Sequence, residues 1–126
     1  MRSFSQCVLL LYVVLLTGCA STGAGDSRSA ISRSQDIQSG MSYEAVLAVF
    51  KGLKTRRTFR GEAMALQACS TVFPKIRDEY VTVWFLEDRV SGLTSRTRPS
   101  GFGGCTDGMR EVDWGQAPAD IRIKID

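Results

Sequence analysis

The sequence predicts a small α+β domain in which an N-terminal helix packs on a small antiparallel β-sheet. Two patterns favour this class: an amphipathic helical pattern at residues 42–52, and a β-branched and aromatic run at residues 80–85 that is followed by a second strand pattern. A third pattern, an apolar run near the N-terminus that ends close to a cysteine, indicates that a signal peptide and a flexible tether precede this domain.

The N-terminal apolar run is short. Residues 8–16 read VLLLYVVLL, whereas about 20 residues are needed to span a bilayer as a helix. With Arg2 before it and Thr17, Gly18 and Cys19 after it, this run resembles a bacterial lipoprotein signal peptide. The resemblance implies cleavage before Cys19 and a lipid on its sulfur. An ordinary secretory signal with an incidental cysteine and an uncleaved anchor are the alternatives.

The residues after Cys19 give the expected location and the domain boundaries. In lipoproteins of this kind, a non-acidic residue in the position of Ala20 implies sorting to the outer membrane, and we expect the domain to face the periplasm. Residues 20–35 are rich in Ser, Gly and Ala and have no apolar period, which is typical of a flexible chain. We therefore expect a signal peptide at 1–18, a lipidated flexible tether at 19–35 and a folded domain at 36–126.

The helix at residues 42–52 is the clearest in the chain. Ser42 is a suitable N-cap, Glu44 places a negative charge in the first turn, and Gly52 provides a stop. Four residues at the spacing i, i+3, i+4 and i+7 give the helix one apolar face: Tyr43, Val46, Leu47 and Phe50.

The clearest strands follow Pro74. Residues 80–85 read YVTVWF, residues 87–88 form a polar break, and residues 89–96 are expected to return as the antiparallel partner. Gly92 weakens that second strand or marks a bulge. Elsewhere the patterns are weaker. Residues 54–60 would make a poor helix, and residues 62–69 could be either a helix or a strand. The many glycines of residues 99–108 predict a loop, and the alternation of apolar and polar residues at 121–125 predicts a short edge strand.

The cysteines and the absence of histidine restrict the chemistry. The chain contains no histidine, which excludes Ser-His-Asp and Cys-His nucleophiles and imidazole zinc sites. Once Cys19 and the signal peptide are set aside, Cys69 and Cys105 are left in an oxidising compartment. We expect them to form one structural disulfide worth roughly 3–4 kcal/mol. A reactive thiol pair is the alternative, although no CxxC spacing supports it.

Charged side chains suggest a surface for a partner. The formal net charge of +3 is too small to favour nucleic acid as the main partner. Arg56, Arg57 and Arg60 form a basic cluster that could meet lipid phosphates or an acidic protein surface. A solvated surface without a ligand is the simpler explanation of these charges.

Two aromatic residues and three acids in the last part of the chain complete the candidate sites. Phe102 and Trp114 could be interface anchors, but Trp114 could also cover the open end of a small core. The acids do not have the spacing of a calcium loop, and we interpret them as parts of a polar loop rather than as a cation site or an acid–base pair. No metal and no cofactor are expected. The acids are Asp107, Glu111 and Asp113.

Two segments resemble one family. Residues 37–46 read IQSGMSYEAV and residues 80–90 read YVTVWFLEDRV, which is similar to the helix entry and hairpin of the BamE (SmpA/OmlA) family of small outer-membrane lipoproteins. The resemblance implies helices packed on a small antiparallel sheet, and it favours a strand at 62–69. Family members have two helices before the sheet, and BamE itself belongs to the machine that inserts β-barrel proteins into the outer membrane.

The sequence therefore favours a non-enzymatic module. We expect a lipid-anchored envelope protein that binds another envelope protein or stabilises an assembly, with the membrane contacted through the lipid on Cys19. The alternative is a small membrane-anchored enzyme or enzyme inhibitor in the periplasm. A deep pocket lined by two carboxylates with raised pKa would favour the enzyme, whereas a flat apolar patch rimmed by charge would favour the module.

Overall fold

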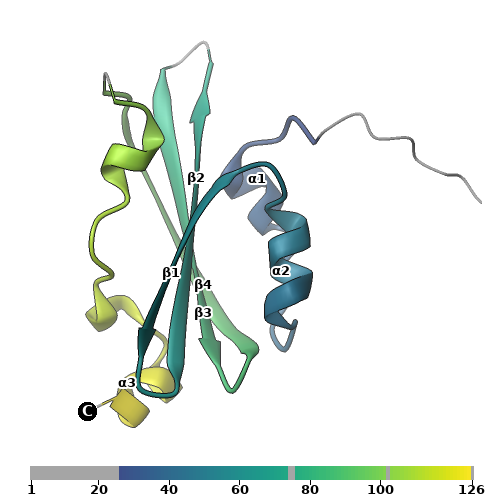
Figure 1. Ribbon diagram of the computed structural model, residues 1–126, viewed down its shortest axis with the longest axis vertical. Coiled ribbons are helices and arrows are strands. Elements are labelled where there is room, and N and C mark those ends of the chain that lie inside the picture. The colour runs from purple at the N-terminus through teal and green to yellow at the C-terminus, as the bar shows by residue number, and fades with distance from the viewer. Residues whose placement is uncertain (1–25, 74–75, 102, 126) are drawn as a thin grey trace, which may run out of the picture.

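A four-stranded antiparallel sheet forms the centre of the domain and is covered on both faces (Figure 1). The computed structural model describes residues 26–73, 76–101 and 103–125. Helices α1 (Ala30–Ser34) and α2 (Tyr43–Val49) lie on one face, here named the helix face. The segment after the last strand covers the opposite, C-terminal face. The expected α+β class with an antiparallel sheet is thus confirmed.

The sheet is a meander in which each strand pairs with the next one in the sequence. The hairpin expected at residues 80–96 and the strand favoured at 62–69 are both present. The first strand, at residues 54–60, had not been predicted from the sequence. Near Gly92 the register of the last pair shifts, which confirms the irregularity expected there. The strands are β1 (Lys54–Arg60), β2 (Ala63–Val72), β3 (Arg77–Leu86) and β4 (Arg89–Pro99).

Strand β1 forms because a tight turn returns the chain onto β2. Gly61 has φ +58° and occupies the first central position of a two-residue hairpin loop, where glycine is favoured. Thr55, Thr58 and Phe59 add β propensity to an otherwise cationic segment. This turn is the signal that explains why 54–60 is a strand.

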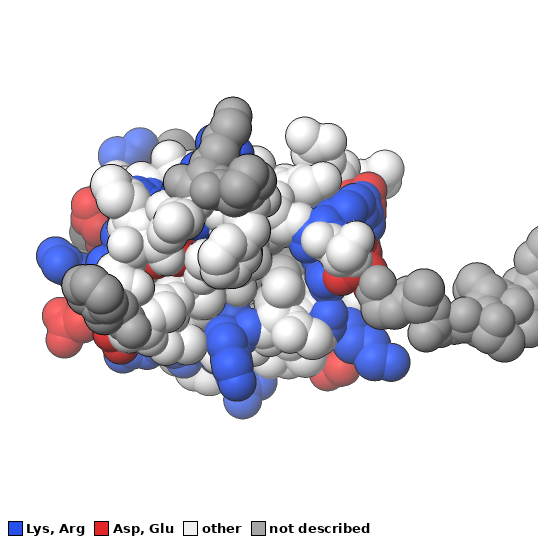
Figure 2. All heavy atoms as spheres, turned by 90° about the horizontal axis from the view of Figure 1, so that it is seen from above, with Lys and Arg blue, Asp and Glu red and all other residues white. Residues whose placement is uncertain are grey.

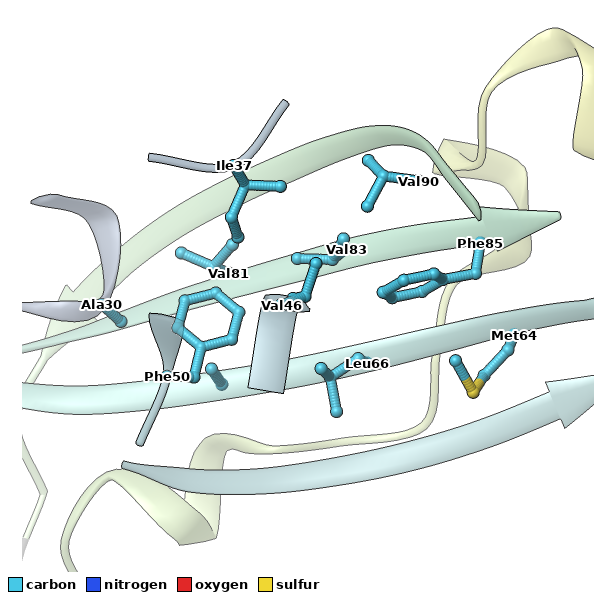
Figure 3. Packing of buried hydrophobic residues seen from close by; sticks show 11 residues of the cluster. Ala30, Ile37, Val46, Phe50, Met64, Leu66, Val81, Val83, Phe85 and Val90 are labelled. Carbon is cyan, nitrogen blue, oxygen red and sulfur yellow. The ribbon is translucent and has the colours of Figure 1, made fainter. Parts of the chain in front are cut away.

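The main core lies between the helix face and the two helices (Figure 3). Alternate residues of β2 and β3, including Leu66, Val83 and Phe85, pack there against Val46 of α2 and against Phe50, the residue that follows this helix. Ser42 caps α2 as expected, because its hydroxyl accepts a hydrogen bond from the backbone N–H of Ala45 at 3.2 Å. The predicted apolar face of α2 is therefore confirmed.

Helix α1 lies within the segment that the sequence had suggested was a flexible tether. Ala30 is fully buried against the core, and Arg33 is only 4% exposed. The Arg33 guanidinium donates to the carbonyl oxygens of Lys51 at 2.7 Å and Val49 at 3.4 Å, just beyond and at the end of α2. Because these carbonyls lack helical partners, Arg33 joins α1 to α2. The folded part thus begins before residue 36.

The C-terminal segment, residues 104–125, covers the other face of the sheet. It contains the short 3₁₀ helices η1 (Cys105–Gly108) and η2 (Trp114–Gln116) and the helix α3 (Ala119–Ile125). Together with β2 and β3 it buries a second, smaller cluster centred on Trp84, which is 1% exposed. The predicted loop at 99–108 therefore ends in a 3₁₀ turn.

The edge strand predicted at 121–125 is wrong, since these residues belong to α3. The alternation of isoleucines suggested a strand, but Ile121 and Ile125 are also at helical spacing and both pack on the second cluster. Ile123, between them, is 79% exposed. Pro118 just before the helix and Asp120 in its first turn are typical of a helix start.

The C-terminal segment is fixed to the sheet at both ends. Near its start, a disulfide joins Cys105 to Cys69 of β2, as expected. Gly108 lies so close to Tyr80 that a Cβ atom would approach the tyrosine oxygen to 1.9 Å, so only glycine fits. Near its end, Pro118 packs against Gly92, where an added Cβ would meet the proline ring at 2.8 Å.

We predict that replacing Cys69 and Cys105 with serine lowers the free energy of unfolding by about 3–4 kcal/mol, because the cross-link no longer restricts the unfolded chain. Urea denaturation followed by tryptophan fluorescence measures this loss. Reduction of the unmodified protein should give the same loss. An unfolding midpoint that reductant leaves unchanged would contradict a stabilising role for the bond.

Candidate functional site

The basic edge strand β1 divides the predicted arginine cluster between two faces of the sheet. Arg56 and Arg60 are paired with Gln67 and Ala63, whose side chains lie on the C-terminal face. Arg57 is paired with Leu66, on the helix face. Because successive side chains of a strand point to opposite faces, three arginines at 56, 57 and 60 cannot form one patch on a flat surface.

On the C-terminal face, two of these arginines contact the C-terminal segment. The Arg56 guanidinium donates to the carbonyl oxygen of Met109 at 3.1 Å. The Arg60 guanidinium lies 6.0 Å from the ring centre of Trp114, at the limit of a cation–π contact. Trp114 in turn meets Trp84 edge to face at 5.5 Å. Trp114 is half-buried and covers the second cluster, as one of the two expectations for it had suggested.

On the helix face, the third arginine lies between two aromatic rings. Its guanidinium is 5.2 Å from the ring centre of Tyr43 and 5.2 Å from that of Phe59. Tyr43 is part of the core surface, but Phe59 is 64% exposed. Arg57 and Phe59 therefore give this side of β1 a cation beside an uncovered aromatic ring.

A small polar cavity lies between the sheet and the C-terminal segment. It has a volume of about 100 Å³, and Gln67, Arg96, Glu111 and Asp113 are among its lining residues. The Gln67 amide nitrogen donates to the carbonyl of Arg110 at 3.3 Å, while its buried oxygen accepts no hydrogen bond within the described residues. Ligand pockets for larger molecules are usually 300–1,000 Å³, so this cavity suits only a small polar group.

A buried carboxylate organises the same face near the β2–β3 turn. Asp78 is fully buried and accepts hydrogen bonds from the hydroxyls of Thr71 and Ser100, both at 2.8 Å, while the Arg98 guanidinium lies 3.6 Å away. Burial raises the pKa of Asp78, but the bonds from Ser100 and Thr71 and the charge of Arg98 outweigh it and lower the pKa overall.

The neighbouring tyrosine is held between this carboxylate and the basic residues of β4. Burial and the negative charge of Asp78 raise the pKa of Tyr80. The guanidinium of Arg96 stacks 4.1 Å from the centre of its ring and donates to the carbonyl of Gly108. These contacts fasten the C-terminal segment to the sheet, so Asp78 and Tyr80 have a structural role.

The structure thus brings together only part of the predicted site. Arg56, Arg60 and Trp114 meet on the C-terminal face, and Arg57 lies on the helix face. Cys19 and Phe102 lie outside the described residues. Sequence reasoning missed Phe59, Gln67, Asp78 and Arg96. Each lies on a different strand, and the alternation along those strands was the available signal for the face that each occupies.

The predicted acids of the C-terminal segment do not gather into a metal site. In the described ranges, no group of three or more His, Cys, Asp or Glu residues is placed to hold a metal ion. Asp113 caps η2, because its carboxylate accepts a hydrogen bond from the N–H of Gly115 at 3.0 Å. Asp107 and Glu111 are exposed.

Comparison with known proteins adds no relative. No protein-family model, curated protein or solved structure matches the chain. Among the helices of the described residues, none is long and apolar enough to cross a membrane. The case for a function therefore depends on the surfaces described above and on the sequence patterns.

We predict that Asp78→Asn lowers the free energy of unfolding at pH 7 by about 1.5–3 kcal/mol, because the hydrogen bonds to a charged acceptor are weakened. The pKa of Asp78 is lower in the folded state, so its contribution is fully present above the unfolded value of about 3.9. That contribution is lost as the pH falls from there through the folded value.

Urea denaturation at pH 7 and at pH 3 or below tests this prediction. The variant should lose less stability on acidification than the natural protein does. Asp88→Asn, in the exposed β3–β4 turn, is the matched control and should change stability by no more than about 0.5 kcal/mol. An equal acid dependence in Asp78→Asn and the natural protein would show that Asp78 does not supply it.

Proposed function

We propose that this protein is a lipid-anchored, non-enzymatic interaction module that binds an acidic partner protein at the periplasmic face of the outer membrane. The observation that carries the proposal is the basic edge of β1. Four of its seven residues are lysine or arginine, none is acidic, and all except the half-buried Thr58 are exposed. A surface of one charge sign steers an oppositely charged partner and selects against others.

The charges on the face drawn in Figure 2 are more mixed than those on β1. Figure 2 views the domain from above, and neutral residues occupy most of the centre of that view. Basic side chains stand mainly toward the rim, several of them beside acidic ones. Mixed charges of this kind give little net attraction. Strand β1, by contrast, has four cations and no acid within seven residues.

The resemblance to the BamE family supports the same kind of function. Its two motifs, 37–46 and 80–90, lie against each other in this fold. The N–H of Gly40 donates to the carbonyl of Val90, and the N–H of Val90 donates to the carbonyl of Met41, both at 2.9 Å. Two helices precede the sheet, as in that family. These contacts give both motifs a shared structural role, and assembly lipoproteins act by binding.

The position of the first described residues fits a membrane anchor. Seven residues, 19–25, separate the end of the signal peptide from Asp26. A chain of that length spans at most about 25 Å when fully extended. On this proposal the domain lies within roughly its own diameter of the bilayer and meets partners in or on the same membrane.

The enzyme alternative has one supporting observation, the cavity beside Glu111 and Asp113. Both carboxylates are exposed to water, and Asp113 already caps a helix. The chain also has no histidine, so a general acid or base in this cavity would have to be one of these carboxylates or Tyr80, which also lines it. Turnover of a substrate that Glu111→Gln abolishes would establish the enzyme instead of the module.

We predict that Cys19→Ala leaves an unprocessed precursor and removes the lipid, because the thiol is the proposed attachment point. Metabolic labelling with a radioactive fatty acid, followed by electrophoresis, measures both effects. Cys7→Ala, within the proposed signal peptide, is the matched control and should be processed and labelled normally. Normal labelling of the Cys19 variant would rule out the anchor.

We predict that reversing the charge of Arg56, Arg57 and Arg60 to glutamate reduces capture of the envelope partner at least tenfold, because the attraction to its acidic surface becomes repulsion. Crosslinking in envelopes, followed by quantitative mass spectrometry, measures capture. The thermal midpoint should change little, since the side chains are exposed and the contacts that Arg56 and Arg60 make with the C-terminal segment are single surface contacts.

The control variant carries the same charge change away from β1, at Arg77, Arg89 and Arg122, all of which are exposed. It should capture the partner normally. A folded β1 variant that captures as much partner as the control variant would remove β1 from the proposed interface. Splitting the β1 variant into Arg57→Glu and the Arg56/Arg60 pair then identifies which face of the strand matters.

A further inference from the structure

We propose that the partner binds by strand addition: an extended acidic segment pairs antiparallel with the free edge of β1 and becomes a fifth strand of the sheet. This inference rests on the proposed function, since it specifies how the acidic partner is held. A free strand edge presents unpaired backbone N–H and C=O groups, and such edges accept strands from other proteins.

The two edges of the sheet differ in how they are protected. At the start of β4, Gly40 and Met41 hydrogen-bond to Val90, and an isolated bridge joins Ser42 to Arg89. The strand also has a register shift, and it ends at Pro99. Bridges, bulges and prolines are recognised ways of blocking an edge. The edge at β4 is therefore poorly suited to accept a new strand.

Strand β1 has none of these blocks within the described residues. Its seven residues pair with β2 in unbroken register from Lys54–Cys69 to Arg60–Ala63. No described segment pairs with its outer side. Only its positive charge protects it against chance pairing. That charge repels basic strands but attracts acidic ones.

A second copy of the chain is disfavoured by that charge. If two β1 strands paired antiparallel about their central residue, Arg57 would face its own copy and Lys54 would face Arg60. Like charges directly opposite each other destabilise a strand pair. The occupant must therefore be a different chain that carries acids.

The positions on β1 define the order of residues in that chain. Lys54, Arg56 and Arg60 share the C-terminal face, and Arg57 and Phe59 share the helix face. An antiparallel strand that starts opposite Arg60 should read acid, apolar, any, acid, acid, any, acid. Its apolar residue would cover the exposed ring of Phe59.

Antiparallel pairing is the arrangement that suits this sheet. All three existing strand pairs are antiparallel, and antiparallel pairs are slightly more stable per residue than parallel ones. The order of the pattern therefore distinguishes strand addition from simple charge attraction. A peptide of the same composition in the order Thr-Glu-Glu-Thr-Val-Glu-Glu, by contrast, places threonine or valine opposite three of the four cations.

Synthetic peptides test the inference on the full-length exported protein, purified in detergent with its disulfide intact. The matched peptide is Glu-Val-Thr-Glu-Glu-Thr-Glu, flanked by glycines and labelled with a fluorophore. One control is the reordered sequence Thr-Glu-Glu-Thr-Val-Glu-Glu. The second control keeps the matched sequence but carries N-methyl groups on the backbone nitrogens that face β1, which removes strand hydrogen bonds and preserves every charge.

Fluorescence anisotropy should give at least tenfold tighter binding for the matched peptide than for either control. Arg57→Glu should weaken the matched peptide at least tenfold, because Arg57 faces its central acid. Amide hydrogen exchange should slow in β1 when the peptide binds and stay unchanged in β4. These results together would establish strand addition at β1.

The outcomes separate this inference from the proposed function. Equal binding of all three peptides, or exchange protection in β4 instead of β1, would overturn strand addition. The acidic-partner proposal would still stand in that case if the charge-reversed variant lost capture in envelopes. If that variant kept full capture, the proposed function would fail whatever the peptides did.

Discussion

The fold depends on one constraint: β2 and β3 are apolar on both faces, so neither face of the sheet can be left in water. Val81, Val83 and Phe85 face the helices, while Tyr80 and Trp84 face the C-terminal segment. Each cover is therefore as necessary as the other, although the chain makes one from helices and the other from short 3₁₀ turns and α3. Strand β1 lies outside this doubly buried centre, which leaves it free to be polar.

Features with a strong local signal were predictable from the sequence. Helix α2 has both a cap and an apolar face. Strand β3 contains a β-branched and aromatic run, and a two-residue polar turn leads from it to β4. The pairing of Cys69 with Cys105 followed from the number of cysteines left after the N-terminal segment was set aside. In each case a few neighbouring residues, or the number of cysteines, were enough to predict the structure.

The features that were missed depend on distant partners. Helix α1 is five residues long, and its Arg33 finds its acceptors at Val49 and Lys51. The spacing of the isoleucines in α3 fits a strand and a helix equally well. Only their packing decides, since Ile121 and Ile125 contact the second cluster. The arginines of the candidate site were close in sequence, but the alternation of β1 separates Arg57 from the others. Segments without their own core cannot reveal their structure locally.

The meander order has a consequence for how the chain folds. Because every strand pairs with its neighbour in sequence, the sheet closes through short loops and has a low contact order, which is typical of rapid folding. The C-terminal segment returns across 36 residues to reach β2 at the disulfide, a closure with a larger entropic cost. We therefore expect the sheet to form before oxidation, with the hairpins holding one thiol in place until residue 105 brings the other.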